Sequence, residues 1–136
     1  MKETITFTIS DVSKQFNLPA STLRYYEMTG LLSHVERNGK HRVYSQAHIN
    51  RLDAIQCFKQ TGMSIKQIEA FFYHEDVTQN YETLIDLLTE QSNHIEAQIQ
   101  LFKENQQHIE KKLNFYQKKK ISFELGQTPP SWDELD

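Results

Sequence analysis

Residues 22–27 read Thr-Leu-Arg-Tyr-Tyr-Glu and place a guanidinium beside two tyrosines, on a short helical pattern that Gly30 closes. Arg24 carries a planar fork of N–H donors that suits a phosphate. Tyr25 and Tyr26 each add a hydroxyl group on a flat apolar ring. Since a second short helical pattern precedes this one, the pair indicates a helix-turn-helix, and double-stranded DNA is the partner that these groups favour.

The distribution of charge is more informative than its total. The 136 residues carry a formal net charge of −3, which by itself does not indicate a nucleic-acid partner. Residues 1–45, however, hold six Lys and Arg against four acids, a net of +2, whereas residues 121–136 hold four acids and no base. A basic front and an acidic tail fit a DNA-binding head on an otherwise acidic protein.

Several classes of protein are disfavoured by simple counts. A single cysteine rules out a disulfide within the chain and a paired-cysteine metal site, so we expect no metal and no cofactor. No apolar run approaches membrane-spanning length, and the N-terminus lacks the apolar core of a signal peptide. We therefore expect a soluble, cytoplasmic protein without a membrane partner.

The elements that must position the Arg-Tyr-Tyr motif begin near the N-terminus. The alternation of Ile5, Phe7 and Ile9 with polar residues predicts a short strand. Ser10 is placed to cap a first helix. The sequence Asn-Leu-Pro at 17–19 breaks that helix, because proline disfavours helical geometry in the residue before it.

A second helix and a hairpin follow. The second helix is expected over residues 20–28 and ends at Gly30. Asn38-Gly39 is a strong signal for a tight hairpin turn. The residues around it predict a basic two-stranded wing, formed by Arg37, Lys40, His41, Arg42 and Tyr44.

Two more helices complete the head. Ser45 caps a helix over 46–61, which Gly62 closes, and Ser64 opens the next one with the sequence of a capping box. Residues 74–79 are expected to form a polar connection. The apolar positions that should face the core are Ile49, Leu52, Ile55, Phe58, Ile65, Ile68, Phe71 and Phe72.

One long helix is expected over residues 81–119, which contain no Gly and no Pro. Apolar residues recur there every seven positions, as in a coiled coil, and a single helix cannot bury such a stripe alone. A second copy of the chain is the natural mate. The predicted seam consists of Leu84, Leu88, Ile95, Ile99, Phe102, Ile109, Leu113 and Tyr116. We thus expect a mainly α fold in three parts, a head over 1–76, a dimerisation helix over 77–120 and a tail over 121–136, either loose or docked by Trp132.

Taken together, these motifs resemble the MerR family of transcription regulators over residues 5–118. The resemblance rests on TLRYYE followed by GLL, on GKHRVY in the wing, and on the long terminal helix. It implies a homodimer joined by an antiparallel coiled coil, with each winged head on half of a pseudo-palindromic promoter. It also implies that the dimer bends and untwists the promoter spacer, so that RNA polymerase is affected indirectly through DNA shape.

The resemblance carries over residue by residue. It places four side chains of the second helix against the major groove and its flanking phosphates, with Tyr26 either in the core or facing DNA. It assigns the phosphate-contacting strip of the wing to Arg42 with its two basic neighbours, while Arg37 contacts DNA or is a solvated turn residue. The predicted DNA-binding residues are Ser21, Thr22, Arg24, Tyr25, Tyr26, Arg37, Lys40, His41, Arg42 and Tyr44.

The signal that such a regulator would sense is a separate question. The lone Cys57 is placed like the cysteine of the thiol-based branch of the family, which responds to aldehydes and other electrophiles. Its neighbours Arg51 and Lys59, or the start of the next helix at Ser64, could lower its pKa. The alternative is that Cys57 only packs in the core, as free cysteines often do. The lack of further cysteines disfavours a soft-metal sensor, and about sixteen residues after the coil are too few for a drug-sensing domain.

Other interpretations remain open at this point. The aromatic cluster of Phe71, Phe72, Tyr73 and Tyr81 could line a pocket for a small ligand, or dock the head against the long helix. A coiled-coil scaffold would explain residues 81–119 but not the basic wing. No nucleophile elbow, phosphate loop or metalloprotease motif indicates an enzyme. A repressor and an activator would look alike.

Overall fold

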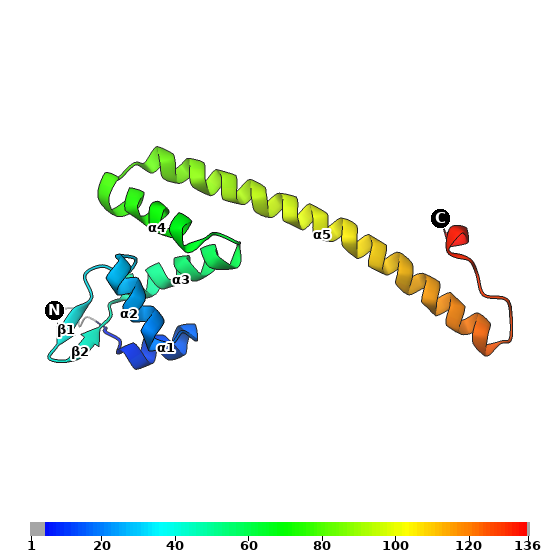
Figure 1. Ribbon diagram of the computed structural model, residues 1–136, viewed down its shortest axis with the longest axis horizontal. Coiled ribbons are helices and arrows are strands. Elements are labelled where there is room, and N and C mark those ends of the chain that lie inside the picture. Colours follow the sequence, from blue (N-terminus) through cyan, green and yellow to red (C-terminus); the bar gives the residue numbers. More distant parts are fainter. Residues whose placement is uncertain (1–4, 136) are drawn as a thin grey trace. The chain divides into compact units, whose positions relative to one another are not determined.

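The computed structural model describes residues 5–135, without the side chains of 134 and 135. Lys2, Glu3 and Asp136, which enter the charge distribution above, lie outside the described residues. The chain forms two compact units, residues 1–88 and 89–136, with their boundary inside the last long helix. The elements in order (Figure 1) are α1 (Ile9–Phe16), α2 (Ala20–Thr29), β1 (Glu36–Asn38), β2 (His41–Val43), α3 (Gln46–Gln60), α4 (Ile65–Tyr73), the π-helical turn η1 (His74–Thr78), α5 (Tyr81–Glu124) and the short 3-10 turn η2 (Trp132–Leu135). The prediction of a mainly α fold with a winged head and a long terminal helix is confirmed.

The start of α1 differs from the prediction. Thr8, and not Ser10, is the N-cap, because its hydroxyl accepts from the Asp11 N–H at 3.1 Å while the Asp11 carboxylate accepts from the Thr8 N–H at 3.0 Å. This reciprocal capping box satisfies two N–H groups at the helix start. The strand expected there is only a single bridge, in which Phe7 and Tyr44 exchange two backbone hydrogen bonds of 2.9 Å.

Helix α2 follows α1 after a short break and packs against it in the head core. Its N-cap, Pro19, offers no side-chain hydrogen bond to the helix start. The helix continues to Thr29, one residue beyond the expected range, and Gly30 closes it as predicted, with φ +87°, a left-handed conformation that glycine adopts without steric cost. Leu23 and Tyr26 face inward.

Helices α3 and α4 both begin with a capping box. Ser64 and Gln67 form the predicted capping box of α4. In α3 the third position is a histidine: the Nδ1 atom of His48 accepts from the Ser45 N–H at 2.9 Å. Its other ring nitrogen lies 2.7 Å from the carbonyl oxygen of Ser33, an acceptor only, so the hydrogen sits on Nε2. His48 therefore ties the start of α3 to the loop that follows α2.

This double role of His48 gives a stability prediction. We expect His48→Ala to lower the free energy of unfolding by about 1–2 kcal/mol, the usual range for loss of a helix cap. His48→Gln should retain most of the stability, because glutamine at this position completes a capping box. Denaturant titration of both variants measures the difference, and equal destabilisation by the two substitutions would contradict the assignment of the cap to this side chain.

The connection after α4 is more ordered than the polar link that the sequence suggested. Residues 74–78 form the π-helical turn η1, and Gln79 ends it with φ +52°. Arg51 of α3 clamps this turn through two hydrogen bonds to the Asp76 carboxylate, at 3.0 and 2.7 Å. The guanidinium carbon of Arg51 also lies 4.0 Å from the centre of the Phe72 ring. One arginine thus fastens α3, α4 and η1 together.

The core of the first unit contains the predicted apolar residues together with the beginning of α5. Ile49, Leu52, Ile55 and Ile68 are buried, and Phe58 is partly buried against Phe71 and Phe72. Leu84 also belongs to this core, at 8% exposure. Its assignment to the dimer seam is therefore corrected, because it packs within its own head.

The second unit consists of the remainder of α5 and the chain that follows. The helix continues five residues beyond the predicted end and stops before Gly126, whose φ is +67°. The Gln127 N–H then donates to the Ser122 carbonyl at 2.8 Å, which satisfies an otherwise free carbonyl. The tail is docked rather than loose, with the Trp132 ring edge-on to Phe115 at 5.3 Å between ring centres.

An open apolar line runs along α5 in this unit. Phe102 is 70% exposed and Ile109 is 66% exposed, although both are large hydrophobic side chains. Ile99, Leu113 and Tyr116 are also exposed. Among the described helices, none is long and apolar enough to cross a membrane.

Candidate nucleic-acid interface

The outer face of α2 presents the polar groups that the sequence singled out. Ser21, Arg24 and Tyr25 are exposed, and Thr22 is half-buried. Arg24 forms no ion pair with any residue in the described part of the chain, so its five N–H donors face solvent. A short helix fixed from beneath by Leu23 can thus offer a cation, a hydroxyl and an aromatic ring to an external partner.

Tyr26 does not belong to that outer face. Its side chain is 2% exposed and packs in the core of the head. Its hydroxyl accepts a hydrogen bond from the Lys59 Nζ atom at 3.3 Å, which links α2 to α3. Of the two roles left open by the sequence, the structure supports the core, so Tyr26 positions the helix instead of contacting DNA.

The wing is a two-stranded antiparallel hairpin that is fastened to α2 by charge. Arg37 on β1 stands directly opposite Arg42 on β2. Glu27, at the end of the Arg-Tyr-Tyr-Glu motif, lies beside both: its Oε2 is 2.7 Å from Arg42 Nε and its Oε1 is 3.8 Å from an Arg37 terminal nitrogen. The hairpin is therefore aligned on the helix by a carboxylate that the sequence did not single out.

Tyr44, which follows β2, is likewise a core residue. Its side chain is completely buried, and its hydroxyl has no hydrogen-bond partner among the described residues. Burial raises the pKa of Tyr44, and the neighbouring Glu27 carboxylate raises it further, against the smaller effects of Arg42, Arg24 and Arg37. The prediction that Tyr44 touches DNA is thus corrected, since this buried ring is not available to a duplex.

The tip of the wing remains open. Lys40 and His41 are exposed, and Gly39 takes a left-handed φ of +66°, as the Asn38-Gly39 turn requires. The structure thus brings the exposed face of α2 and the basic wing together on one unit through Glu27. Sequence reasoning missed two positioning residues, Glu27 and His48. Glu27 contacts Arg42 and His48 contacts Ser33, each fifteen residues away in the sequence. The only local signal was the three-residue spacing of Ser45 and His48, which is that of a capping box.

Cys57 is exposed on α3, so the interpretation that it serves only as core packing is not supported. The two basic residues expected to act on its thiol are engaged elsewhere. Arg51 holds Asp76, and Lys59 donates to Tyr26. The thiol is accessible to solvent.

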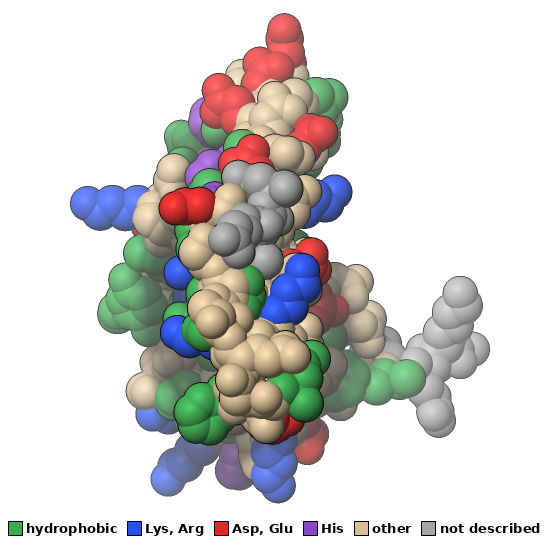
Figure 2. Space-filling model, turned by 90° about the vertical axis from the view of Figure 1, so that its right-hand side faces the viewer, with side chains coloured by type: hydrophobic (Ala, Val, Ile, Leu, Met, Phe, Trp, Pro, Cys, Tyr) green, Lys and Arg blue, Asp and Glu red, His purple; other side chains and the backbone are tan. Residues whose placement is uncertain are grey.

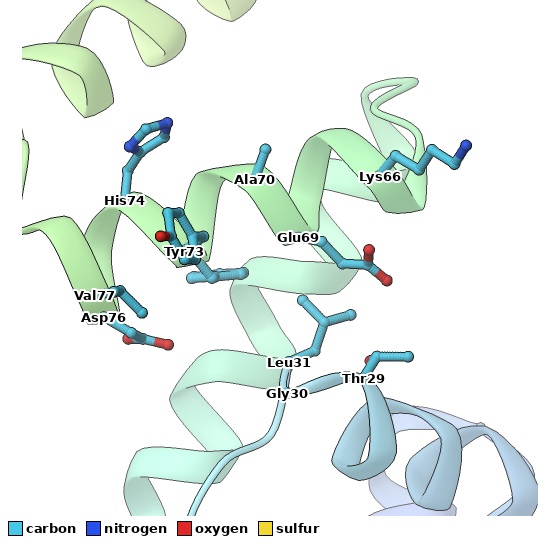
Figure 3. Close-up of a pocket in the computed structure, with 11 residues that line it drawn as sticks. Thr29, Gly30, Leu31, Lys66, Glu69, Ala70, Tyr73, His74, Asp76 and Val77 are labelled. Carbon is cyan, nitrogen blue, oxygen red and sulfur yellow. The ribbon is translucent and has the colours of Figure 1, made fainter.

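A pocket of about 480 Å³ lies beside the end of α2. Figure 3 shows that its lining residues come from three segments: the end of α2 with the two residues after it, helix α4, and the turn η1. Tyr73 and His74 lie at the α4–η1 side, and Asp76 there is the residue held by Arg51. Phe71 is buried and Tyr81 does not line this pocket, so the predicted aromatic cluster is divided between core and surface.

Charged side chains of both signs, with hydrophobic side chains between them, are visible on the face shown in Figure 2. No group of three or more His, Cys, Asp or Glu residues that could hold a metal ion occurs within residues 5–135.

The head matches a known protein family by sequence. Residues 7–75 match the model of the MerR HTH family regulatory proteins. An uncharacterized HTH-type transcriptional regulator of Haemophilus influenzae is 32% identical over 118 residues, which span 85% of this chain and 87% of that protein. The HTH-type transcriptional regulator AdhR of Bacillus subtilis is 41% identical over 61 residues, 44% of each protein.

Solved structures agree over a larger part of the chain. The crystal structure of HiNmlR, a MerR family regulator lacking the sensor domain, bound to promoter DNA, has a TM-score of 0.77 and 29% identity, and the match covers 97% of this chain and 96% of that one. A MerR family regulator from Bacillus thuringiensis has a TM-score of 0.67 and 28% identity over 81% of this chain and 98% of its own. The chain therefore belongs to the MerR family of helix-turn-helix transcriptional regulators.

Proposed function

We propose that this regulator binds a pseudo-palindromic promoter as a homodimer, with one head on each half-site. The observation that carries the proposal is the exposed Arg24, which has no ion-pair partner among the described residues and stands beside Tyr25 on a helix flanked by a basic wing. The likeness to a family member bound to promoter DNA supports it. In this proposal Ser21, Thr22, Arg24 and Tyr25 face the major groove, and Arg37, Lys40 and His41 approach the flanking phosphates.

The exposed apolar side chains along α5 support the proposed dimer. Side chains such as Phe102 and Ile109 are costly to leave in water, and a second copy would bury them. The seven-residue repeat from Tyr81 to Tyr116 is symmetric about the peptide between Gln98 and Ile99. Antiparallel pairing about that point aligns every member of the repeat, with Ile95 beside Phe102, Leu88 beside Ile109 and Tyr81 beside Tyr116 of the partner. Any other register loses at least one pair.

The dimer would act on transcription through the shape of the promoter. Two heads fixed to one antiparallel coil can hold two half-sites at a set spacing and angle. A duplex that fits poorly must then bend or untwist, at an energy that depends on its sequence. RNA polymerase, acting in the cytoplasm on the same promoter, would sense the change without touching the regulator.

Titration onto duplex DNA tests the proposal. The protein should bind a mixed-sequence duplex at about 50 mM salt and lose most of that affinity at about 200 mM, because each phosphate contact releases counterions. Selection from a random-sequence pool should then recover inverted repeats. Absence of binding, or binding that does not change with salt, would leave a coiled-coil scaffold as the better account.

A second proposal concerns the signal, and the exposure of Cys57 favours it. We propose that an electrophile modifies this thiol and that the adduct alters the head. After treatment with formaldehyde, methylglyoxal or a quinone, peptide mapping should find an adduct on the Cys57 sulfur of the wild type, and the matching Cys57→Ser peptide should carry none. The promoter response to the same compounds should fall to the uninduced level in the variant.

The control for this prediction is Cys57→Ala, which removes the thiol without adding a hydroxyl group. Both variants should bind DNA as the wild type does when no electrophile is present. A response that survives in both variants would remove the thiol hypothesis. It would leave a ligand in the pocket beside α2, or no inducer, as the alternatives.

A further inference from the structure

The chain passes from the head into α5 through the turn η1. This turn is π-helical, a geometry that is rare and frequent at functional sites. Gln79 ends it with φ +52°, a left-handed conformation that costs free energy for a residue with a side chain. Asn80 then caps α5, because its Oδ1 accepts from the Thr83 N–H at 3.2 Å. The geometry of η1 therefore sets the direction in which α5 begins.

Apolar packing holds the beginning of α5 to the head. Leu84 is buried in the head core and Leu87 packs against it, and residues 81–88 of α5 belong to the same unit as the head. The hydrophobic effect is non-directional, so this packing keeps the helix in place but determines its tilt only weakly. Within η1, the side-chain hydrogen bonds between His74 and Thr78 stay inside the turn and add no link to another element.

The directional contact comes from Arg51 of α3. Its guanidinium group donates to both oxygens of the Asp76 carboxylate, at 3.0 and 2.7 Å, while its central carbon lies over the Phe72 ring. Asp76, labelled in Figure 3, is the one described residue of η1 whose side chain forms a hydrogen bond with another element. A two-bond arginine–carboxylate pair fixes the plane of both groups, and here the side chains are only 19% and 33% exposed. This pair thus orients η1, and with it the start of α5, on α3.

The length of α5 amplifies any change in that orientation. α5 is one continuous helix, and the stretch from Tyr81 to the proposed dimer centre at Gln98 spans about 26 Å. Over that length, a change of about 7° at the junction displaces a head by about 3 Å. One added base pair shifts a half-site by a similar distance, about 3.4 Å. A dimer that distinguishes half-sites by a single base pair of spacing therefore needs a junction held within a few degrees.

We propose that Arg51 and Asp76 are positioning residues, whose pairing sets the spacing of half-sites that the dimer accepts. The inference rests on the proposed binding of an inverted repeat by a homodimer. It assigns the pair no contact with DNA. Each head binds its half-site with or without the pair, and the pair fixes the distance and angle at which the second head arrives. A dimer without the pair should accept several spacings instead of one.

The first test compares Asp76→Asn with Glu75→Gln, on inverted repeats whose spacers differ by single base pairs. Glu75 is exposed and makes no ion pair with a described residue, so its replacement makes the same change of charge on η1 and leaves the Arg51 contact intact. For the wild type and Glu75→Gln, affinity should peak sharply at one spacing. For Asp76→Asn, the ratio of affinities between the best spacing and its neighbours should fall about tenfold, as for the loss of a hydrogen bond to a charged group.

A duplex with a single half-site shows whether the pair merely supports the fold of the head. Affinity for it should stay within about twofold of the wild type in Asp76→Asn, because the proposed DNA-facing side chains lie on α2 and the wing. An equal fall on the single half-site would reduce the pair to a support of the head and overturn the proposal. An unchanged spacing ratio in Asp76→Asn, or an equal loss in Glu75→Gln, would overturn it as well.

The second test introduces Arg51→Met in the wild type and in Asp76→Asn. Methionine removes the guanidinium group and can still cover Phe72, so it breaks the pair from the other side. Its effect on the spacing ratio should equal that of Asp76→Asn, and the double variant should show no further loss, because all three lack the same interaction. Additive losses would contradict the pairing. Circular dichroism verifies folding, and Arg51→Met alone decides the question if Asp76→Asn does not fold.

The wild-type protein separates this inference from the proposed function. A wild type that binds inverted repeats equally at all spacings would overturn the inference and leave the proposed DNA binding in place. A wild type that binds no duplex would overturn the proposed function first, and this inference with it.

Discussion

Replacement of Arg24 with alanine should reduce affinity for a selected inverted-repeat duplex by at least about thirtyfold. A side chain that contacts DNA contributes about 1–3 kcal/mol, and a symmetric dimer loses the contact twice. Arg24 is exposed and forms no ion pair in the described part of the chain, so no internal interaction offsets the loss. Fluorescence anisotropy at several salt concentrations measures both affinity and salt dependence.

The salt dependence says which contact was lost. If Arg24 holds phosphates, the slope of log affinity against log salt should become shallower by about two units per dimer. If it reads a base, discrimination at one position of the half-site is lost with the slope nearly unchanged. Lys118→Ala removes the same charge from an exposed site far along α5 and should change neither quantity. Equal effects of the two substitutions would show that Arg24 contributes only its positive charge and makes no specific contact with DNA.

Replacement of Phe102 with aspartate should convert the dimer to monomers. Truncation of a buried phenylalanine lowers stability by about 3–5 kcal/mol, and an unpaired carboxylate buried in its place lowers the stability of the dimer further. Because the dimer is symmetric, each effect occurs twice. The side chain is 70% exposed in the single chain, so folding of the monomer should be unaffected. Analytical ultracentrifugation gives the molecular mass, and circular dichroism verifies that the helices remain.

The DNA-binding consequence follows from symmetry. A monomer engages one half-site, so affinity for the inverted repeat should fall toward that for mixed-sequence DNA. Gln100→Asp provides the matched control, because it introduces the same charge two residues away on another face of α5. A Phe102→Asp variant that remains dimeric would show that the partner does not bind along this line.

Local signals in the sequence were sufficient for most helix boundaries. Glycines at 30 and 39 lie where a left-handed residue is needed, and a glycine can supply that conformation in any context. The capping box of α4 was visible because its two members are three residues apart. The cap of α1 could have been found the same way, since Thr8 and Asp11 have that spacing, while Ser10 is followed three residues later by Ser13.

Contacts between distant elements were beyond reach of the sequence. Nothing local indicates that Glu27 meets Arg42, or that Arg51 meets Asp76, because each pair is joined only by the fold. The predicted helix and hairpin are both present and lie in one unit, whereas the Glu27 carboxylate that aligns them was missed. Helical geometry, by contrast, could have predicted that Cys57 is exposed. It lies two residues, about 200°, from the buried Ile55, and so on the other side of α3.

The exposed thiol also has a practical consequence. Because Cys57 is the one cysteine in the chain, a maleimide dye or nitroxide would label a single known position on each head without any substitution. In a dimer the two labels would form a symmetric pair. The distance between them, measured by energy transfer or pulsed electron resonance, would follow any movement of the heads as they take hold of a promoter.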